Sequence, residues 1–207
     1  LTGYYLVNAN VYRCVVTSVC GINTNSNPAT LTVNPNPTIT VTASPGTNLY
    51  QGVTSTISVP NISPNAGVSY SWMKNGVVMQ GATGASITVG VDDIGTYTVA
   101  VTDINGCSAI SNNIIINQVD ARKLFIYPNP SSGQFQVRDY SAANAPTNHM
   151  ITIFDSKGSR VYQKLYPVSR IYDRMDVNLV NVSSGIYLVE LMDSNGKRLA
   201  SSRILIK

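Results

Sequence analysis

Apolar and polar residues alternate in short runs along most of this chain. In the stretch Gln134-Phe135-Gln136-Val137-Arg138, for example, Phe135 and Val137 alternate with polar neighbours. This period of two is typical of a strand with one buried face. Gly, Pro, Asn, Ser and Thr fill the gaps between such runs. The pattern predicts an all-β fold class built from short strands and turns.

Seven runs with strand character lie between residues 38 and 117. The predicted strands are 38–43, 54–59, 68–74, 77–79, 86–89, 96–102 and 110–116. Trp72 lies on the third of them, and the stretch Asp93-Ile94-Gly95-Thr96-Tyr97 resembles the tyrosine corner of immunoglobulin-like domains. The resemblance implies a complete immunoglobulin-like β-sandwich over residues 38–117.

The core of this sandwich is expected to be apolar and without a disulfide. Immunoglobulin domains carry a cysteine two residues beyond the corner tyrosine. Val99 occupies that position here. We therefore expect Trp72 to pack against aliphatic side chains such as Ile57 and Val99.

The start of the chain repeats part of this pattern. Tyr12 aligns with Tyr97 at a spacing of 85 residues, and Asn10 takes the place of Gly95. Asn is the residue next best able to adopt a positive φ. Residues 1–33 are therefore predicted to be the last three strands of a partial immunoglobulin-like repeat, at 1–7, 11–18 and 29–33. We expect the chain to be the C-terminal part of a longer protein, and we expect residues 34–37, Asn-Pro-Asn-Pro, to be a semi-rigid joint.

The three cysteines, Cys14, Cys20 and Cys107, cannot all pair within the chain. Cys14 aligns with Val99, so we expect a structural disulfide from Cys14 to a residue outside this sequence. Bacterial immunoglobulin-like repeats that resemble this one pair a cysteine placed like Cys107 with one near the second strand. Tyr50 occupies that place here, which leaves Cys107 as an unpaired thiol. A zinc site is disfavoured because the cysteine spacing matches no ligand pattern, and we expect no metal or other cofactor.

Residues 124–207 form the most distinctive stretch. Tyr127 and Asn129 each precede a proline, which favours extended chain, and Pro128 and Pro130 lack a backbone donor, which favours a sheet edge. Seven strands are predicted, at 124–127, 134–138, 150–154, 160–166, 174–179, 185–192 and 198–206. Two of the turns have a glycine at the position where a hairpin needs positive φ, in 155–158 and in 193–196.

The order of motifs in this stretch resembles a known family. YPNPSSGQFQV is followed by a short apolar strand ending in DSKGSRV, then by SSGIYLVEL and by a basic terminal strand. This order resembles the C-terminal sorting domain, type A (Por secretion), of Bacteroidetes type IX secretion cargo. We expect the sorting signal to include residues from each of these motifs and from the terminal strand. They are Tyr127, Pro128, Asn129, Pro130, Gly133, Asp155, Gly158, Gly185, Tyr187, Arg203 and Lys207.

The resemblance implies that the last domain is an export signal. Its partners would be the type IX translocon, an outer-membrane shuttle barrel and a sortase that removes the domain. Anionic lipopolysaccharide would then replace it, and the protein would be secreted or displayed on the cell surface. Cleavage is expected between residues 117 and 124, in the polar joint before the domain.

The run Gly185-Ile-Tyr-Leu-Val-Glu-Leu-Met192 is apolar on both faces. Such a strand is either central to a sandwich or partly reserved for a docking partner. We expect core packing, with docking carried by exposed turns and the terminal strand.

Charge separates the two parts of the chain. Residues 1–120 hold two basic and four acidic residues, whereas residues 121–207 hold twelve basic and six acidic ones. The basic part could attract an acidic partner or lipopolysaccharide, or it could simply be a solvated surface. Nucleic-acid binding is disfavoured because the basic residues accompany no recognised nucleic-acid motif.

Nothing in the sequence points to an enzyme. Asp92 and Asp93 are adjacent, so on a strand they would point to opposite faces and could not share a proton, and His149 is expected in a solvated loop. Nucleophile elbows and phosphate-binding glycine loops are absent from the sequence, and no apolar run reaches the ~18 residues of a transmembrane segment. Two functions remain: an export signal behind spacer repeats, or an adhesin that binds carbohydrate or protein through residues 38–117.

Overall fold

The fold is all-β, as the alternation predicted. The computed structural model describes residues 10–63, 69–140 and 146–207. Strands succeed one another along the chain, and one short 3₁₀ turn, η1 (Val91–Asp93), interrupts them. Two separate clusters of buried apolar residues exist, one within residues 41–116 and one within residues 124–206. We refer to residues 38–118 as the middle unit and to residues 124–207 as the C-terminal unit.

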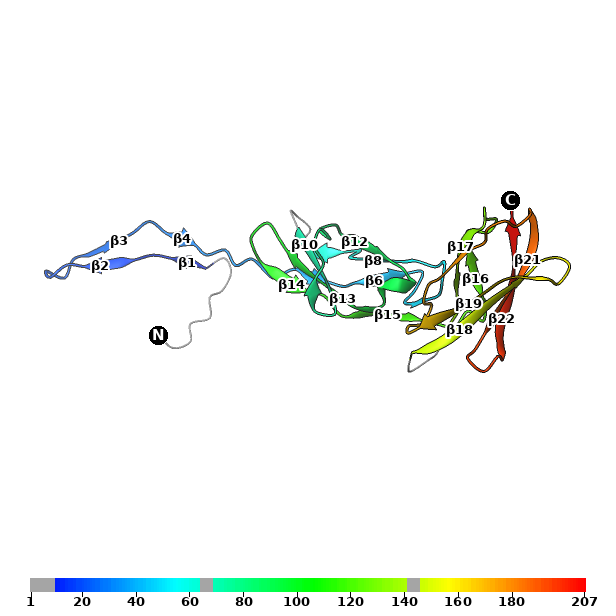
Figure 1. Ribbon diagram of the computed structural model, residues 1–207. Helices are drawn as coiled ribbons and strands as arrows, with labels where there is room; N and C mark the ends of the chain where they lie inside the picture. Colours follow the sequence, from blue (N-terminus) through cyan, green and yellow to red (C-terminus); the bar gives the residue numbers. More distant parts are fainter. Residues whose placement is uncertain (1–9, 64–68, 141–145) are drawn as a thin grey trace.

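The N-terminal segment is a thin ribbon that extends away from the middle unit (Figure 1). Its strands are β1 (Val11–Tyr12), β2 (Val15–Thr17), β3 (Asn23–Asn25) and β4 (Ala29–Thr30), and they pair as β1 with β4 and β2 with β3. All side chains from residue 10 to residue 30 are exposed. The strand predicted at 11–18 is divided into β1 and β2, and the strand predicted at 29–33 is shortened to β4; within the described residues no second sheet packs on them. The strand predicted at 1–7 lies outside the described residues.

The middle unit is a layered sandwich of short strands. The strands are β5 (Thr38–Ile39), β6 (Thr42–Ser44), β7 (Asn48–Leu49), β8 (Ser55–Ser58), β9 (Ile62–Ser63), β10 (Ser69–Lys74), β11 (Val77–Val78), β12 (Ser86–Val89), β13 (Gly95–Thr102), β14 (Ser108–Ile110) and β15 (Ile114–Gln118). One sheet has the order β11-β10-β13-β15-β7, with β14 also on β13, and another has the order β12-β8-β6. β5 pairs with β9.

The strand predicted at 110–116 is divided in the structure, and polar contacts explain the division. Ser111 Oγ accepts a hydrogen bond from the Val99 N–H at 3.0 Å, and Asn112 Oδ1 accepts one from the Val41 N–H at 3.0 Å. Both β14 and β15 pair with β13. In the stretch of chain between them, these side-chain hydrogen bonds take the place of regular pairing. The strand predicted at 38–43 is likewise divided into β5 and β6.

Large apolar side chains fill the middle core. Trp72, Ile57 and Val99 are fully buried in one cluster, and Trp72 and Val99 are opposite each other on β10 and β13. The Trp72 indole N–H donates to the Gly84 carbonyl at 2.8 Å, so its polar atom is satisfied inside the core.

The C-terminal unit consists of two sheets. Its strands are β16 (Phe125–Tyr127), β17 (Gln134–Arg138), β18 (Thr147–Phe154), β19 (Arg160–Val168), β20 (Met175–Asn178), β21 (Gly185–Met192) and β22 (Arg198–Ile206). They form one sheet of order β16-β17-β20 and one of order β19-β18-β21-β22. β17, β21 and β22 have the bounds that were predicted from the sequence.

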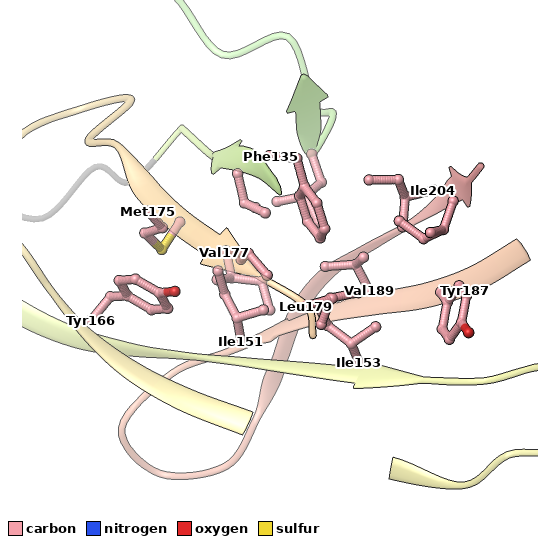
Figure 2. Packing of buried hydrophobic residues seen from close by; sticks show 14 of the residues in the cluster. Phe135, Ile151, Ile153, Tyr166, Met175, Val177, Leu179, Tyr187, Val189 and Ile204 are labelled. Atoms are coloured by element: carbon pink, nitrogen blue, oxygen red, sulfur yellow. The ribbon is translucent and has the colours of Figure 1, made fainter. Parts of the chain in front are cut away.

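The inward side chains of these two sheets meet in a single core. Figure 2 shows Phe135 and Val177 from one sheet facing Ile151, Val189 and Ile204 from the other. Burying a side chain of this size contributes about 1.5–3 kcal/mol to folding. This core therefore gives the C-terminal unit its own source of stability.

One expectation about this unit is wrong. His149 was expected in a solvated loop, but it lies within β18 and is only 5% exposed. The reason is that β18 and β19 pair further than the alternation suggested, from Thr147 opposite Val168. Pro167 is tolerated in β19 because β19 is an edge strand.

Candidate functional site

The clearest arrangement among the predicted residues joins the Tyr-Pro-Asn-Pro segment to the terminal strand. The Asn129 Nδ2 atom donates to the Arg203 carbonyl at 3.0 Å, and the Leu205 N–H donates to Asn129 Oδ1 at 3.0 Å. One side-chain amide thus makes the two bonds that a neighbouring strand would make with β22.

Ser131 continues the same contact with its backbone. Its N–H donates to the Leu205 carbonyl at 2.9 Å, and the Lys207 N–H donates to the Ser131 carbonyl at 2.9 Å. Residues 129–131 therefore cover the outer edge of β22 from Arg203 to Lys207. We call this contact the Asn129 clamp.

Gly133 allows the chain to turn from the clamp into β17. Its φ is +106°, and a Cβ at this position would lie 2.7 Å from the Leu179 carbonyl oxygen. The Leu179 N–H also donates to the Gly133 carbonyl at 2.9 Å. Ser131 Oγ accepts from the Gly133 N–H at 3.1 Å, which fixes the turn. Only glycine combines this backbone conformation with this close approach.

An open hollow of about 430 Å³ lies beside the clamp, on the outer face of the β16-β17-β20 sheet. Tyr127, Gln136 and Asp176 lie opposite one another across the three strands. Tyr127 is 67% exposed, and with Pro128 it forms part of the wall. The proline-rich motif therefore presents one surface to β22 and another to solvent.

β21 turns out to be both a core strand and an exposed one. It lies between β18 and β22, and its side chains Tyr187, Val189 and Leu191 point into the core. On the outer face, Ile186 is 57% and Leu188 is 37% exposed. The expected core packing therefore holds for one face only.

The outer face continues onto the terminal strand. Ile186 lies opposite Leu205, and Leu188 lies opposite Arg203. Arg203 and Lys207 are exposed, and within the described ranges neither has a carboxylate partner. Apolar and basic side chains thus share the surface next to the clamp.

The other predicted signal residues lie elsewhere. Asp155 Oδ1 accepts from the N–H groups of Lys157 and Ser159 in the β18–β19 turn, where Gly158 has a φ of +82°. The Tyr187 hydroxyl donates to the Ser183 carbonyl at 2.7 Å, beside Gly185 at the start of β21. The structure gives these residues turn and core contacts and does not bring them to the clamp.

In the middle unit, the corner residues contact one another. The Tyr97 hydroxyl donates to the Asp93 carbonyl, and burial, with Asp93 nearby, raises the pKa of Tyr97 to about 12. Asn75 was not anticipated: its Oδ1 accepts from the Thr96 N–H at 2.9 Å and would lie 2.8 Å from a Cβ on Gly95. An Asn-Gly pair in a hairpin turn, such as Asn75-Gly76, is the sequence signal that could have drawn attention to it.

Asp92 and Asp93 form ion pairs with different basic side chains. Asp92 pairs with Arg138 of the C-terminal unit at 2.7 Å, and Asp93 pairs with Lys74 at 3.6 Å. The two carboxylates therefore form separate ion pairs, Asp92 with the C-terminal unit and Asp93 with the middle unit.

The three cysteines are free thiols in this structure. Cys14 and Cys20 are exposed, and the Cys107 Sγ lies 3.8 Å from the Asn34 carbonyl. A disulfide from Cys14 to a residue outside the chain remains a prediction. Among the described residues, no group of three or more His, Cys, Asp or Glu side chains is arranged to hold a metal ion.

Comparison with known protein families bears on the C-terminal unit. Residues 125–207 match the family described as the secretion system C-terminal sorting domain. This part of the chain is a type IX sorting domain. The resemblance expected from the Tyr-Pro-Asn-Pro motif onward is thereby confirmed. The sorting domain implies export to the cell surface or secretion, with the secretion machinery as its partner.

Comparison with solved structures gives three matches, among others, that cover most of this chain. The FN1-FN3 domains of chicken CNTN1 are 12% identical, with a TM-score of 0.32, and the match covers 98% of this chain and 78% of that one. Dimeric latent PorU from Porphyromonas gingivalis is 12% identical, with a TM-score of 0.34 and coverage of 83% and 20%. SGBP-B of Bacteroides ovatus, solved with a mixed-linkage heptasaccharide, is 16% identical, with a TM-score of 0.33 and coverage of 85% and 48%.

The chain thus spans about a fifth of the PorU structure and about half of the SGBP-B structure. No curated protein sequence matches the chain. None of the described residues belongs to a helix that is long and apolar enough to cross a membrane.

Proposed function

We propose that the sorting domain is recognised through the surface around the Asn129 clamp. The single observation that supports this most strongly is the pair of bonds between the Asn129 amide and β22, which unites motifs 74 residues apart. A receptor that binds this surface contacts the Tyr-Pro-Asn-Pro segment and the terminal strand together, which is possible only when the domain is folded. The exposed Tyr127, Arg203 and Lys207 side chains lie on or next to this surface.

The proposed partners are an outer-membrane shuttle barrel and the type IX translocon, followed by a sortase that exchanges the domain for anionic lipopolysaccharide. Arg203 and Lys207 are exposed and have no carboxylate partner in the described part of the chain, which supports an acidic or anionic partner. Cleavage is proposed between residues 117 and 124. Asp120, Arg122 and Lys123 are exposed in this joint, which supports its use as a cleavage site. Mass spectrometry of the exported protein tests this cleavage, and an intact C-terminus on the exported protein would contradict it.

The division of the chain is part of the proposal. Residues 1–33 would be part of an immunoglobulin-like repeat, residues 38–117 a complete immunoglobulin-like domain, and residues 124–207 the sorting domain. We propose that the first two act as spacers and that no part of the chain is an enzyme. The separate apolar clusters of the middle and C-terminal units support a division between them.

Export of a reporter tests the proposal. Residues 124–207 are fused behind a signal peptide and a fluorescent protein, and the fusion is produced in a host with type IX secretion. The reporter is expected at the surface or in the medium. Asn129→Ala, and deletion of residues 203–207, should each reduce export, whereas Asn148→Ala, at an exposed position on β18, should not. Retention of the unmodified fusion in the periplasm would refute the export function, and full export of both clamp variants would refute the recognition surface.

The alternative function is an adhesin that binds carbohydrate or protein through the middle unit. A carbohydrate-binding face needs exposed aromatic rings. Trp72 and Tyr97 are buried, Tyr70 is half-buried, and Tyr50 stacks on Phe125 with ring centroids 6.3 Å apart. These positions favour the spacer role. Specific binding of the middle unit on a glycan array would overturn it.

A further inference from the structure

Contacts between the middle and C-terminal units surround the joint that connects them. The Arg138 Nη1 atom donates to both carboxylate oxygens of Asp92, at 2.7 and 2.9 Å. The Arg138 side chain is only 12% exposed, and its Nε also donates to Gln136 Oε1 at 3.1 Å. This arginine is therefore held by its own sheet while it binds the other unit. Because Asp92 itself is largely exposed, solvent weakens the pair, and the contact needs further support.

Tyr172 provides that support from the loop between β19 and β20. Its side chain is buried, and its hydroxyl donates to the Val119 carbonyl at 2.8 Å and accepts from the Ala121 N–H at 3.3 Å. Its backbone has a φ of +56°. A bulky residue rarely adopts this conformation, and it persists only where the surroundings impose it. The hydroxyl thus binds the backbone of the joint directly.

Further groups hold the joint from both sides. The Gln118 Nε2 atom donates to the Val91 carbonyl at 2.8 Å and to the Ile171 carbonyl at 3.3 Å, one in each unit. The Phe125 ring packs edge-on against Tyr172 at 5.8 Å, and the Tyr140 ring does the same at 5.7 Å. These aromatic and hydrogen-bonded contacts tie the joint to both units, and we call them the seal.

Only a very short exposed segment lies between the two fixed ends of the joint. Val119 is bound by Tyr172, and its own N–H donates to the Leu49 carbonyl at 2.9 Å. Leu124 is buried in the C-terminal core, and β16 begins at the next residue. A protease binds several residues on both sides of the bond it cuts in extended form. Residues 120–123 are exposed or half-buried, but they are too few to reach into such a cleft while both ends are fixed.

We propose that the loop containing Tyr172, together with the Arg138–Asp92 pair, is a latch that protects the joint from proteolysis until the two units separate. This inference rests on the proposed removal of the sorting domain and adds its regulation. Cleavage follows undocking, so a partner that binds the C-terminal unit and displaces the middle unit controls when the domain is removed. Before that event the joint is resistant although its charged side chains are exposed.

Trypsin tests the latch without any secretion machinery. Arg122 and Lys123 are exposed tryptic sites within the joint, and Arg160 is an exposed site elsewhere in the C-terminal unit. The purified chain of residues 1–207 is digested briefly, and mass spectrometry measures the ratio of cutting at the joint to cutting after Arg160. Using a ratio removes the effect of global unfolding. Tyr172→Phe and Asp92→Asn are each expected to raise this ratio about three- to tenfold, in line with the loss of one or two hydrogen bonds.

Asp176→Asn is the matched control. It removes an ion pair of similar length, Arg174 to Asp176 at 2.6 Å, that does not bridge the two units. Its ratio should equal that of the unmodified chain. A ratio that is the same in all four proteins overturns the latch. The trypsin assay needs no export, so an unchanged ratio would refute the latch without refuting the sorting function. A failed export assay, in turn, would not alter the trypsin result.

Discussion

Replacing Asn129 by alanine is the most direct test of the Asn129 clamp. The substitution removes the bonds from the side-chain amide to the Arg203 carbonyl and from the Leu205 N–H. Each such bond contributes about 0.5–1.5 kcal/mol net. Asn129 is exposed, so water hydrates the freed groups and no buried group is left unpaired. The expected cost is therefore about 1–2 kcal/mol, confined to the end of β22.

Amide hydrogen exchange followed by NMR measures this cost at the residue concerned. A loss of 1–2 kcal/mol corresponds to exchange of the Leu205 amide that is about 5–30 times faster. Asn129→Asp keeps an acceptor for the Leu205 N–H but loses the donor to the Arg203 carbonyl, so its effect should be smaller. Asn148→Ala should leave the Leu205 amide unchanged. If Leu205 exchanges at the same rate in Asn129→Ala as in the unmodified chain, the clamp does not stabilise β22.

Three further substitutions probe the cores and turns. Gly133→Ala should destabilise the C-terminal unit by about 1–3 kcal/mol in urea unfolding, because the backbone has a positive φ and the new Cβ would meet the Leu179 carbonyl. Gly158→Ala is the control, since the space around that glycine is open, and a smaller loss of stability in Gly133→Ala than in Gly158→Ala would contradict the prediction. Tyr97→Phe should lower the stability of the middle unit by about 0.5–1.5 kcal/mol, seen as a lower urea midpoint by Trp fluorescence. Burial lowers the pKa of His149 below 6.5, so on acidification the unfolded chain binds a proton at this imidazole before the folded chain does, and the free energy of unfolding should fall as the pH drops from 6.5 toward the folded-state pKa. His149→Gln should lose that part of the pH dependence, and an unchanged dependence of unfolding free energy on pH would refute it.

The regular strands could be predicted from sequence, because the pattern of apolar and polar residues along a strand is a local property. β17, β21 and β22 begin and end at the residues that their local patterns predict. Local patterns also identified the glycine turns and the family resemblance of the C-terminal unit.

Contacts between distant residues could not be predicted in the same way. Nothing local to Asn129 shows that its amide reaches β22, and nothing local to Asp92 shows that it binds an arginine 46 residues later. The pairing that buries His149 depends on how far β19 follows β18. The division between β14 and β15 depends on Ser111 and Asn112 binding β13 and Val41. Each of these features is decided by tertiary contacts, which outweigh local preference.

The covered edge of β22 also bears on self-assembly. An open strand edge with unpaired N–H and C=O groups is a template for pairing with another chain, and the risk grows where the strand carries apolar side chains such as Leu205. Residues 129–131 occupy the hydrogen-bonding groups of this edge from Arg203 to Lys207. A second molecule therefore cannot add a strand there. The proline-rich segment thus blocks edge-to-edge pairing between neighbouring copies along the C-terminal end of β22, from Arg203 onward.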